Sequence, residues 1–237
     1  MKGKFIGIGI GPGDPELLTL KAIRLIQETK IICVPKASKE KESVALKIIG
    51  SYLTEKQTIV ELIMPMTKNF DELKSYWNAA AETILDYLRQ GQNVVCVTLG
   101  DASLYSTYLY VQQYIATVDP EIIIETIPGI TSFAAAAAQL NISLAEGNEK
   151  LAIIPAVENV ADLEIVLDTF SNIILMKVSG QFEEIIATLE KRGILNQSIL
   201  VSRCGQPEEK IEYDLAKMKG QKPDYLSLIL IKQGGKA

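Results

Sequence analysis

Residues 5–17 read FIGIGIGPGDPEL, in which an apolar strand runs into a glycine-rich turn and then into a helix start. Short apolar runs and helical stretches continue to alternate along the rest of the 237 residues. Such alternation is typical of α/β layers built on mostly parallel strands. We therefore expect about five strands in each half of the chain. The expected domains are an N-terminal one over residues 1–127 and a C-terminal one over residues 128–237.

The spacing of apolar residues predicts the individual elements. Strands are expected at residues 5–10, 31–34, 59–63, 94–99, 122–127, 151–154, 173–178, 198–202, 210–213 and 225–231. Helices are expected at residues 43–52, 69–90, 105–117, 131–140, 161–170 and 182–191. A first helix is expected to begin at Asp14, Pro15 and Glu16, which suit a cap and the first helical turn. Pro35 is expected to end the second strand, and Trp77 to anchor the long third helix in the core.

Composition excludes several kinds of function. Histidine is absent, which removes imidazole bases, histidine metal ligands and Ser-His or Cys-His nucleophile pairs. The three cysteines lie far apart without zinc-like spacing, so no metal site is expected, and Cys33 and Cys96 read as core residues. The net charge of −5 argues against nucleic acid as a partner. No signal peptide and no apolar run of about 18 residues is apparent, so we expect a reducing cytosol and no membrane.

Three loops that follow strands are candidates for ligand binding. In residues 7–14 the glycines alternate and Pro12 removes an N–H group, so the loop is no dinucleotide fingerprint and could be a tight turn without a ligand. In residues 97–107, Asp101 could bind a ligand, act as a base or cap a helix. In residues 127–133, Thr131 and Ser132 offer hydroxyl groups that suit either a cap or a site.

Further loops follow strands at residues 176–180 and 202–207, and the basic stretch 36–41 does so too. Ligands of open α/β sheets gather at the carboxyl ends of strands, where all these loops are expected. Composition and spacing alone therefore indicate an α/β protein that binds a small ligand.

The segment GIGPGDPELLTLKA at residues 9–22 closely resembles the opening motif of the tetrapyrrole methylases. TLGD at 98–101 and PGITS at 128–132 resemble the family's second and third motifs, although Ala102 stands where the family usually has proline. This resemblance spans nearly the whole chain. It implies two αβα domains, S-adenosylmethionine in the cleft between them, S-adenosylhomocysteine as its product, and a homodimer.

Within the family, the chain resembles enzymes that methylate C-20 of precorrin-2 or cobalt-factor II in cobalamin biosynthesis. The segments that carry this likeness lie at residues 64–67, 99–107, 132–133 and 144–147. The resemblance implies a tetrapyrrole substrate. We expect a base to remove its C-20 proton, and Asp101 is the candidate. Residues implied to contact the cofactor are Pro12, Leu99, Gly100, Asp101, Leu104, Thr131, Ser132, Met176 and Gly205, with Pro12 also bordering the substrate. Basic residues able to meet the substrate's carboxylates are Lys36, Lys39, Lys41, Lys68 and Arg203.

Other functions stay open at this point. The nearest alternative is another regiospecificity within the family, on uroporphyrinogen III, precorrin-3 or precorrin-4. A diphthine synthase is a more distant relative. From other classes, an NAD-binding oxidoreductase or a non-catalytic tetrapyrrole carrier could share this fold class. The residues do not distinguish a cobalt-containing from a metal-free substrate.

Overall fold

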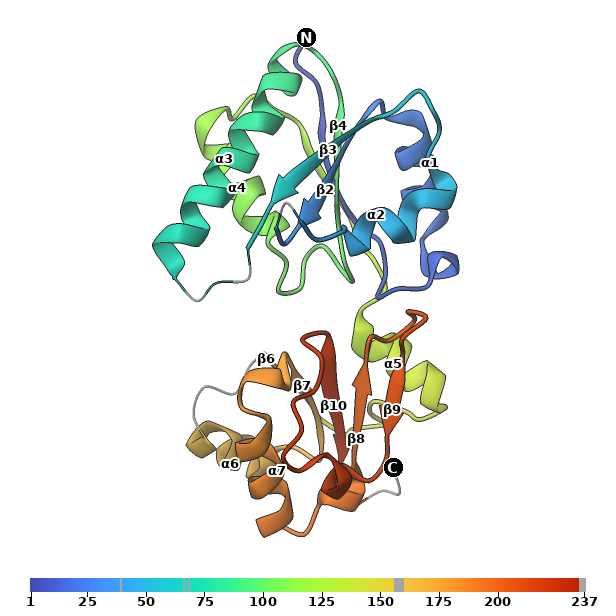
Figure 1. Ribbon diagram of the computed structural model, residues 1–237, viewed down its shortest axis with the longest axis vertical. Coiled ribbons are helices and arrows are strands. Elements are labelled where there is room, and N and C mark those ends of the chain that lie inside the picture. Colours follow the sequence, from blue (N-terminus) through green and yellow to red (C-terminus); the bar gives the residue numbers. More distant parts are fainter. Residues whose placement is uncertain (39, 66, 68, 156–159, 235–237) are drawn as a thin grey trace. The chain divides into compact units, whose positions relative to one another are not determined.

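The computed structural model describes residues 1–38, 40–65, 67, 69–155 and 160–234. The chain divides into two compact units, Met1–Thr131 and Ser132–Ala237, each built on a five-stranded sheet with helices packed against it (Figure 1). The expectation of two α/β domains is confirmed. The units divide between Thr131 and Ser132, whereas the sequence placed the boundary between residues 127 and 128. Each unit is described by itself, and the cleft expected between them stays a prediction.

The N-terminal sheet is entirely parallel, with strand order β3-β2-β4-β1-β5. Its strands are β1 (Phe5–Gly9), β2 (Ile31–Lys36), β3 (Thr58–Ile63), β4 (Val94–Thr98) and β5 (Ile124–Ile127). The two strands β1 and β4 are buried along their whole length. Because all five strands point the same way, the loops that follow them lie along one end of the sheet, at the carboxyl ends of the strands.

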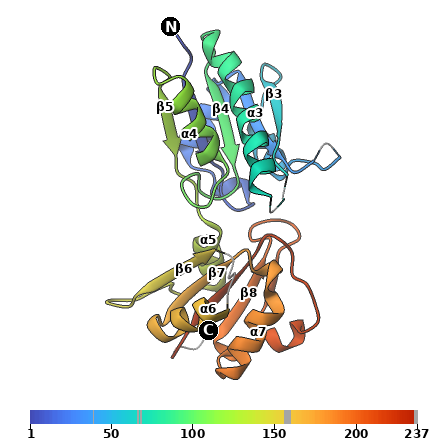
Figure 2. The same ribbon diagram turned by 90° about the vertical axis from the view of Figure 1, so that its left-hand side faces the viewer.

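Helices cover both faces of this sheet. Helices α3 (Phe70–Arg89) and α4 (Tyr108–Val118) lie side by side on one face, and α1 (Leu20–Glu28) and α2 (Val44–Ile49) lie on the other (Figures 1 and 2). Successive strand residues enter different cores, since Phe5 packs with α3 and α4 while Ile6 packs with α1 and α2. Trp77 is 6% exposed and stacks on Tyr110 with ring centroids 3.9 Å apart, so its expected role as a core anchor is confirmed.

The first helix begins later than the sequence indicated. Asp14 does accept a hydrogen bond from the Glu16 N–H at 2.8 Å, but the turn that follows is a 3-10 helix of three residues, Pro15–Leu17. Leu18 is extended and buried in the core beside α1. Helix α1 then starts anew, with the Thr19 hydroxyl accepting from the Ala22 N–H at 3.2 Å. Burial of Leu18 therefore interrupts what the sequence indicated as one helix.

Pro35 does not end the second strand, which continues to Lys36. Strand β4 pairs with β2 only over Ile31–Cys33, while β3 pairs with it through Lys36. Beyond Cys33 one side of β2 is therefore an edge, where a residue without an N–H group is tolerated.

Helix α4 was expected from residue 105, but it begins at Tyr108. Tyr105 has a left-handed backbone with φ of 50°, a conformation incompatible with a right-handed helix. The Ser106 hydroxyl accepts from the Tyr108 N–H at 3.2 Å. Residues 99–107 therefore form a loop at the edge of the sheet rather than the start of a helix.

The C-terminal sheet has the order β6-β7-β10-β8-β9 and is mixed. Its strands are β6 (Leu151–Pro155), β7 (Asn172–Met176), β8 (Ser198–Ser202), β9 (Lys210–Glu212) and β10 (Ser227–Lys232). β10 is antiparallel to both β7 and β8, and β9 is antiparallel to β8. The expectation of mostly parallel strands is therefore wrong here. Between β8 and β10 the chain forms β9 and the 3-10 helix Leu215–Met218 but no α-helix, which is the usual crossover between parallel strands.

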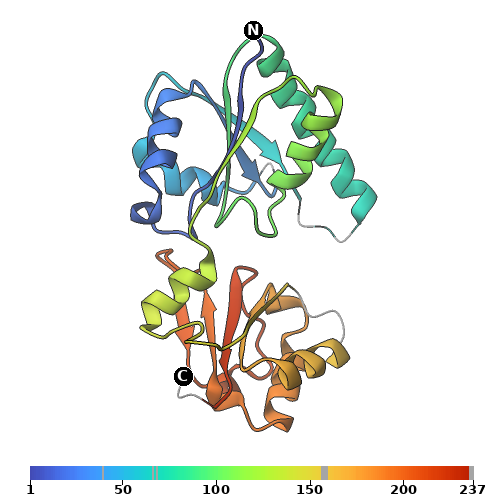
Figure 3. The same cartoon turned by 180° about the vertical axis from the view of Figure 1, so that it is seen from behind.

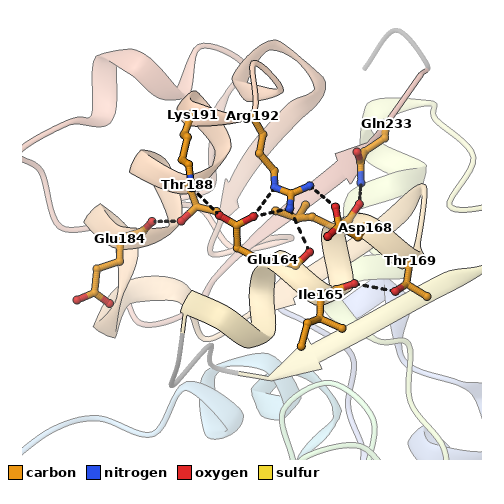
Figure 4. Close-up of polar contacts among 10 residues, drawn as sticks. Glu164, Ile165, Asp168, Thr169, Glu184, Thr188, Lys191, Arg192 and Gln233 are labelled. Carbon is orange, nitrogen blue, oxygen red and sulfur yellow. Dashed lines mark hydrogen bonds and ion pairs between the residues drawn. The ribbon is translucent and has the colours of Figure 1, made fainter.

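Helices α6 (Val160–Thr169) and α7 (Phe182–Lys191) cover one face of this sheet, and α5 (Ser132–Leu140) lies on its other side (Figures 1 and 3). Arg192, directly after α7, binds two carboxylates of α6 (Figure 4). Its Nε lies 2.9 Å from Glu164 and a terminal nitrogen lies 2.6 Å from Asp168.

No helix among the described residues is long and apolar enough to cross a membrane.

We predict that Arg192→Ala lowers the melting temperature of the C-terminal unit by a few degrees. Its loss leaves Glu164 and Asp168 facing each other at i,i+4 on α6, and such like-charge pairs destabilise a helix. Arg24→Ala is the matched control, because it breaks an i,i+4 pair with Glu28 whose partners are both more than half exposed. Differential scanning calorimetry measures both variants; an equal shift for the two would contradict the importance of the Arg192 cluster.

Glu125 gives a second, pH-dependent prediction. Hydrogen bonds from Lys21 and Lys4 lower the pKa of Glu125 from 4.5 to about 2. A folded-state pKa below the unfolded value adds stability above pH 4.5, and this stability is lost as the pH falls toward 2. Glu125→Gln should therefore be less stable than the parent at pH 7, with the difference shrinking on acidification. Urea unfolding at several pH values measures it, and a difference independent of pH would contradict the assignment.

Candidate active site

The loops after β1 and β4 are joined by backbone hydrogen bonds. The Gly11 N–H donates to the Gly100 carbonyl at 3.2 Å, and the Gly100 N–H donates to the Gly11 carbonyl at 2.7 Å. Both residues have left-handed backbones, with φ of 75° and 71°, which glycine adopts at little cost. The glycine-rich first loop is therefore one half of a two-loop structure.

The loop after β5 packs against the same two loops through its backbone. A Cβ atom at Gly129 would lie 2.3 Å from the Gly100 oxygen and 2.6 Å from the Gly9 carbonyl carbon. A Cβ at Gly9 would lie 2.6 Å from the Gly129 nitrogen and 2.9 Å from the Ala102 nitrogen. These distances leave no room for a side chain at either position. Three loops from the adjacent strands β4, β1 and β5 therefore meet backbone to backbone.

Asp101 connects two of these loops through its carboxylate. One oxygen accepts from the Gly129 N–H at 2.8 Å, and the other accepts from the Ser103 N–H at 2.8 Å and from the Ser103 hydroxyl. Partial burial raises the pKa of Asp101, but hydrogen bonds from Ser103, Gly129 and Ala102 together bring that pKa below its ordinary value of 3.8. Asp101 is thus a carboxylate at neutral pH, with both oxygens bound to protein groups.

The other cofactor candidates of this unit lie in the same three loops, and Ser132 directly follows as the first residue of the C-terminal unit. Pro12 is buried, while Leu99, Gly100, Leu104 and Thr131 are half-buried. A Cβ at Gly100 would meet no atom within 4 Å. One side of the Gly100 peptide therefore faces open space, so a ligand can approach the backbone there. Thr131 and Ser132 carry hydroxyl groups that can bind a polar ligand.

In the C-terminal unit, Met176 ends β7 and Arg203 and Gly205 follow β8. β7 and β8 both run antiparallel to β10, so their carboxyl ends share one edge of the sheet. Arg203 has a left-handed backbone with φ of 52°, and its Nε donates to Asp224 at 2.8 Å. These three predicted residues thus lie at the same end of the C-terminal sheet, at the carboxyl ends of β7 and β8.

The predicted substrate cations fall into three groups. Lys36 ends β2, but its ammonium group lies 2.8 Å from Glu61 and its side chain is only 13% exposed. Arg203 likewise has an acidic partner, whereas Lys41 is exposed. Lys39 and Lys68 lie outside the described residues. Among the residues that the structure describes, no cluster of acidic, cysteine or histidine side chains could hold a metal ion.

A separate surface hollow of about 350 Å³ lies in the C-terminal unit. It is lined by Leu195, Asn196, Ile199, Tyr213 and Asp214. Residues 195–197 directly precede β8, so this hollow lies near the amino end of that strand. It is therefore distinct from the loops at the carboxyl ends.

Sequence reasoning did not find the partners of the key side chains. Gly129 and Ser103 bind Asp101, Glu61 binds Lys36, and Asp224 binds Arg203. Only Ser103 had a local signal, because aspartate often accepts from the N–H group two residues later. The other partners follow from the fold.

The fold and these loops define a two-domain α/β protein with a glycine-lined edge suited to a small polar ligand. The family model described as Tetrapyrrole (Corrin/Porphyrin) Methylases matches residues 4–218, and the chain belongs to this family. It is 36% identical to the probable cobalt-precorrin-2 C(20)-methyltransferase of Methanocaldococcus jannaschii, over 97% of this chain and 96% of that protein. It is 34% identical to the cobalt-precorrin-2 C(20)-methyltransferase of Salmonella typhimurium, over 98% and 97%.

A third relative, the precorrin-2 C(20)-methyltransferase of a Sinorhizobium species, is 28% identical over 97% of this chain and 95% of that protein. Among solved structures, a cobalt precorrin-4 methyltransferase matches with a TM-score of 0.70 at 23% identity, covering 97% of this chain and 94% of that one. A uroporphyrin-III C-methyltransferase from Thermus thermophilus, complexed with S-adenyl homocysteine, matches with a TM-score of 0.65 at 20% identity, covering 96% and 97%. These two likenesses show the fold.

We predict that Gly129→Ala destabilises the N-terminal unit by about 1–3 kcal/mol, the usual range for an overpacked site. The added methyl group would overlap the Gly100 oxygen and the Gly9 backbone. Gly50→Ala is the matched control, because its Cβ would meet nothing within 4 Å and its φ is −53°. Urea unfolding measures both, and an unchanged midpoint for Gly129→Ala would contradict the packing described here.

Proposed function

We propose that this protein transfers the methyl group of S-adenosylmethionine to C-20 of cobalt-precorrin-2 in cobalamin biosynthesis. The observation that carries the proposal is its similarity, over nearly the full length of both chains, to two relatives named for this reaction. The identity of 34–36% to these relatives exceeds the 28% to the relative named for precorrin-2 without cobalt. This difference favours the cobalt-containing substrate, which the residues alone did not distinguish.

The residues present suit the cofactor. Open space beside the Gly100 peptide can admit a ligand close to the backbone, and the Thr131 and Ser132 hydroxyls can bind the polar amino-acid part. We assign to cofactor binding Pro12, Leu99, Gly100, Asp101, Leu104, Thr131, Ser132, Met176 and Gly205. When bound, S-adenosylmethionine supplies an electrophilic sulfonium methyl group.

The chain's own contribution is to orient and enclose the reactants. Holding two reactants in line can remove about 7–11 kcal/mol of the barrier. The fixed backbone of the three loops suits that task, because their contacts leave little freedom for movement. This chemistry needs no imidazole, which agrees with the absence of histidine. Asp101 as general base stays a prediction, and its lowered pKa makes it a weak base near neutral pH.

The substrate's carboxylates are proposed to meet Lys36, Lys39, Lys41, Lys68 and Arg203. Lys36 is paired with Glu61 and Arg203 with Asp224. A substrate carboxylate would share or replace those partners.

A homodimer and a cytosolic location complete the proposal. The homodimer rests on the family resemblance, and equilibrium sedimentation tests it. The location agrees with three free cysteines among the described residues, all buried, as expected of a protein from a reducing compartment. Membership of the methylase family argues against an NAD-binding oxidoreductase.

The proposal predicts that anaerobic incubation with S-adenosylmethionine and cobalt-precorrin-2 adds one methyl group at C-20. Mass spectrometry detects the methyl group and NMR locates it. Metal-free precorrin-2 in a parallel incubation should react more slowly. Methylation at another carbon would replace the regiospecificity, while macrocycle binding without methyl transfer would favour the carrier alternative.

A charge variant tests the substrate-binding residues. Lys41→Ala should raise KM for the macrocycle about threefold, the effect of losing one exposed charge pair, and leave kcat nearly unchanged. Lys56→Ala is the matched control, because this exposed lysine lies before β3, at the opposite edge of the sheet. Steady-state kinetics measures both, and equal KM values would remove Lys41 from the proposed set.

A further inference from the structure

We propose that Asp101 is a positioning residue, whose carboxylate fixes the Gly129 peptide and with it the loop that leads to Thr131 and Ser132. This inference rests on the proposed function for the identity of the ligand, but its structural part concerns the ligand-free chain. It assigns Asp101 a structural role, in which its carboxylate holds the loops after β4 and β5 together, in place of the role of proton acceptor.

The geometry of the carboxylate suits this structural role. One oxygen is 2.8 Å from the Gly129 nitrogen, and the other receives the N–H and the hydroxyl of Ser103. Each oxygen therefore faces a different loop, one after β5 and one after β4. A general base needs a pKa near the working pH. The hydrogen bonds that the Asp101 carboxylate accepts from Ser103 and Gly129 instead lower its pKa from the ordinary value of 3.8.

The loop that Asp101 binds follows a short strand at the side of the sheet. Strand β5 is only four residues long and pairs with β1 alone. Pro128 follows the strand and has no N–H group, so Gly129 carries the first backbone donor of the loop. Asp101 accepts from that donor. The position of the Gly129 peptide in turn determines where the chain continues to Thr131, two residues later.

Packing on the other side makes the position of Gly129 sensitive to this hydrogen bond. The Gly129 backbone lies against Gly9 and the Gly100 oxygen so closely that no Cβ would fit. The Gly100 oxygen also accepts from Gly11. A shift of the Gly129 peptide would therefore displace the loops after β1 and β4, where the cofactor candidates Pro12 and Leu99 lie.

Three variants distinguish the structural role of Asp101 from a role as general base. Asp101→Asn keeps an oxygen that can accept from Gly129 but cannot take up a proton. Asp101→Ala removes both abilities. Ser103→Ala is the matched control, because it removes one hydroxyl donor to Asp101 and leaves the bond to Gly129 in place.

The readouts are amide hydrogen exchange at Gly129 by NMR in the ligand-free protein, Kd for S-adenosylmethionine by calorimetry, and the pH profile of kcat. We expect Asp101→Ala to speed exchange at Gly129 and to raise Kd, each by about tenfold, the effect of losing one hydrogen bond to a charged group. Asp101→Asn should restore most of the protection, cofactor affinity and turnover. Ser103→Ala should keep the protection of Gly129 and the parent's pH profile.

The inference is overturned if Asp101→Asn is as inactive as Asp101→Ala while Gly129 exchange and cofactor affinity match the parent. An acid limb of the parent pH profile that Ser103→Ala shifts would also identify Asp101 as a base. Failure of the proposed function looks different. In that case the parent transfers no methyl group to cobalt-precorrin-2. The exchange measurement at Gly129 still decides whether the Asp101 carboxylate holds the loop after β5 in place.

Discussion

The close contact of three backbone turns at the carboxyl edge of the N-terminal sheet is the constraint on which the rest of the site depends. Strands β4, β1 and β5 are neighbours in the sheet. The last residue of β1, Gly9, meets Gly100 and Gly129 in the turns after β4 and β5. Side chains at Gly9 or Gly129 would occupy the space of another backbone. The absence of side chains there lets three loops form one continuous backbone surface, with open space beside Gly100.

Hydrogen bonds join these turns to one another. Gly11 and Gly100 exchange two hydrogen bonds, and the Asp101 carboxylate accepts from the loop after β5. A charged acceptor forms stronger hydrogen bonds than a neutral one, which explains a carboxylate at this position. The same bonds make Asp101 a poor proton acceptor, so a structural role competes with the predicted role as a base. An enzyme that mainly orients two reactants benefits more from the first role than from the second.

Much of the fold could be predicted from the sequence, because its strongest patterns are local. Helix α7 and strand β8 lie at the predicted residues, and α3 differs by one residue at each end. Predictions failed where a distant contact decided the outcome. Leu18 interrupts the first helix to reach the core, and β10 pairs antiparallel with both β7 and β8, which precede it by many residues.

The same distinction applies to the site. The motif loops were predicted to share a sheet edge, since parallel strands bring their carboxyl ends together. The partners of the charged residues were not predictable, because they lie far away along the chain. Gly129 is 28 residues from Asp101, Glu61 is 25 from Lys36 and Asp224 is 21 from Arg203. No local pattern encodes such pairs, and only the packing of the sheets reveals them.

A crystal structure with S-adenosylhomocysteine bound would test directly whether the three joined loops form the cofactor site. We expect the ligand in the open space beside Gly100, with its amino-acid part at Thr131 and Ser132 and the Asp101 carboxylate still bound to the Gly129 N–H. A ligand held elsewhere, or an Asp101 carboxylate turned away from Gly129, would contradict the account.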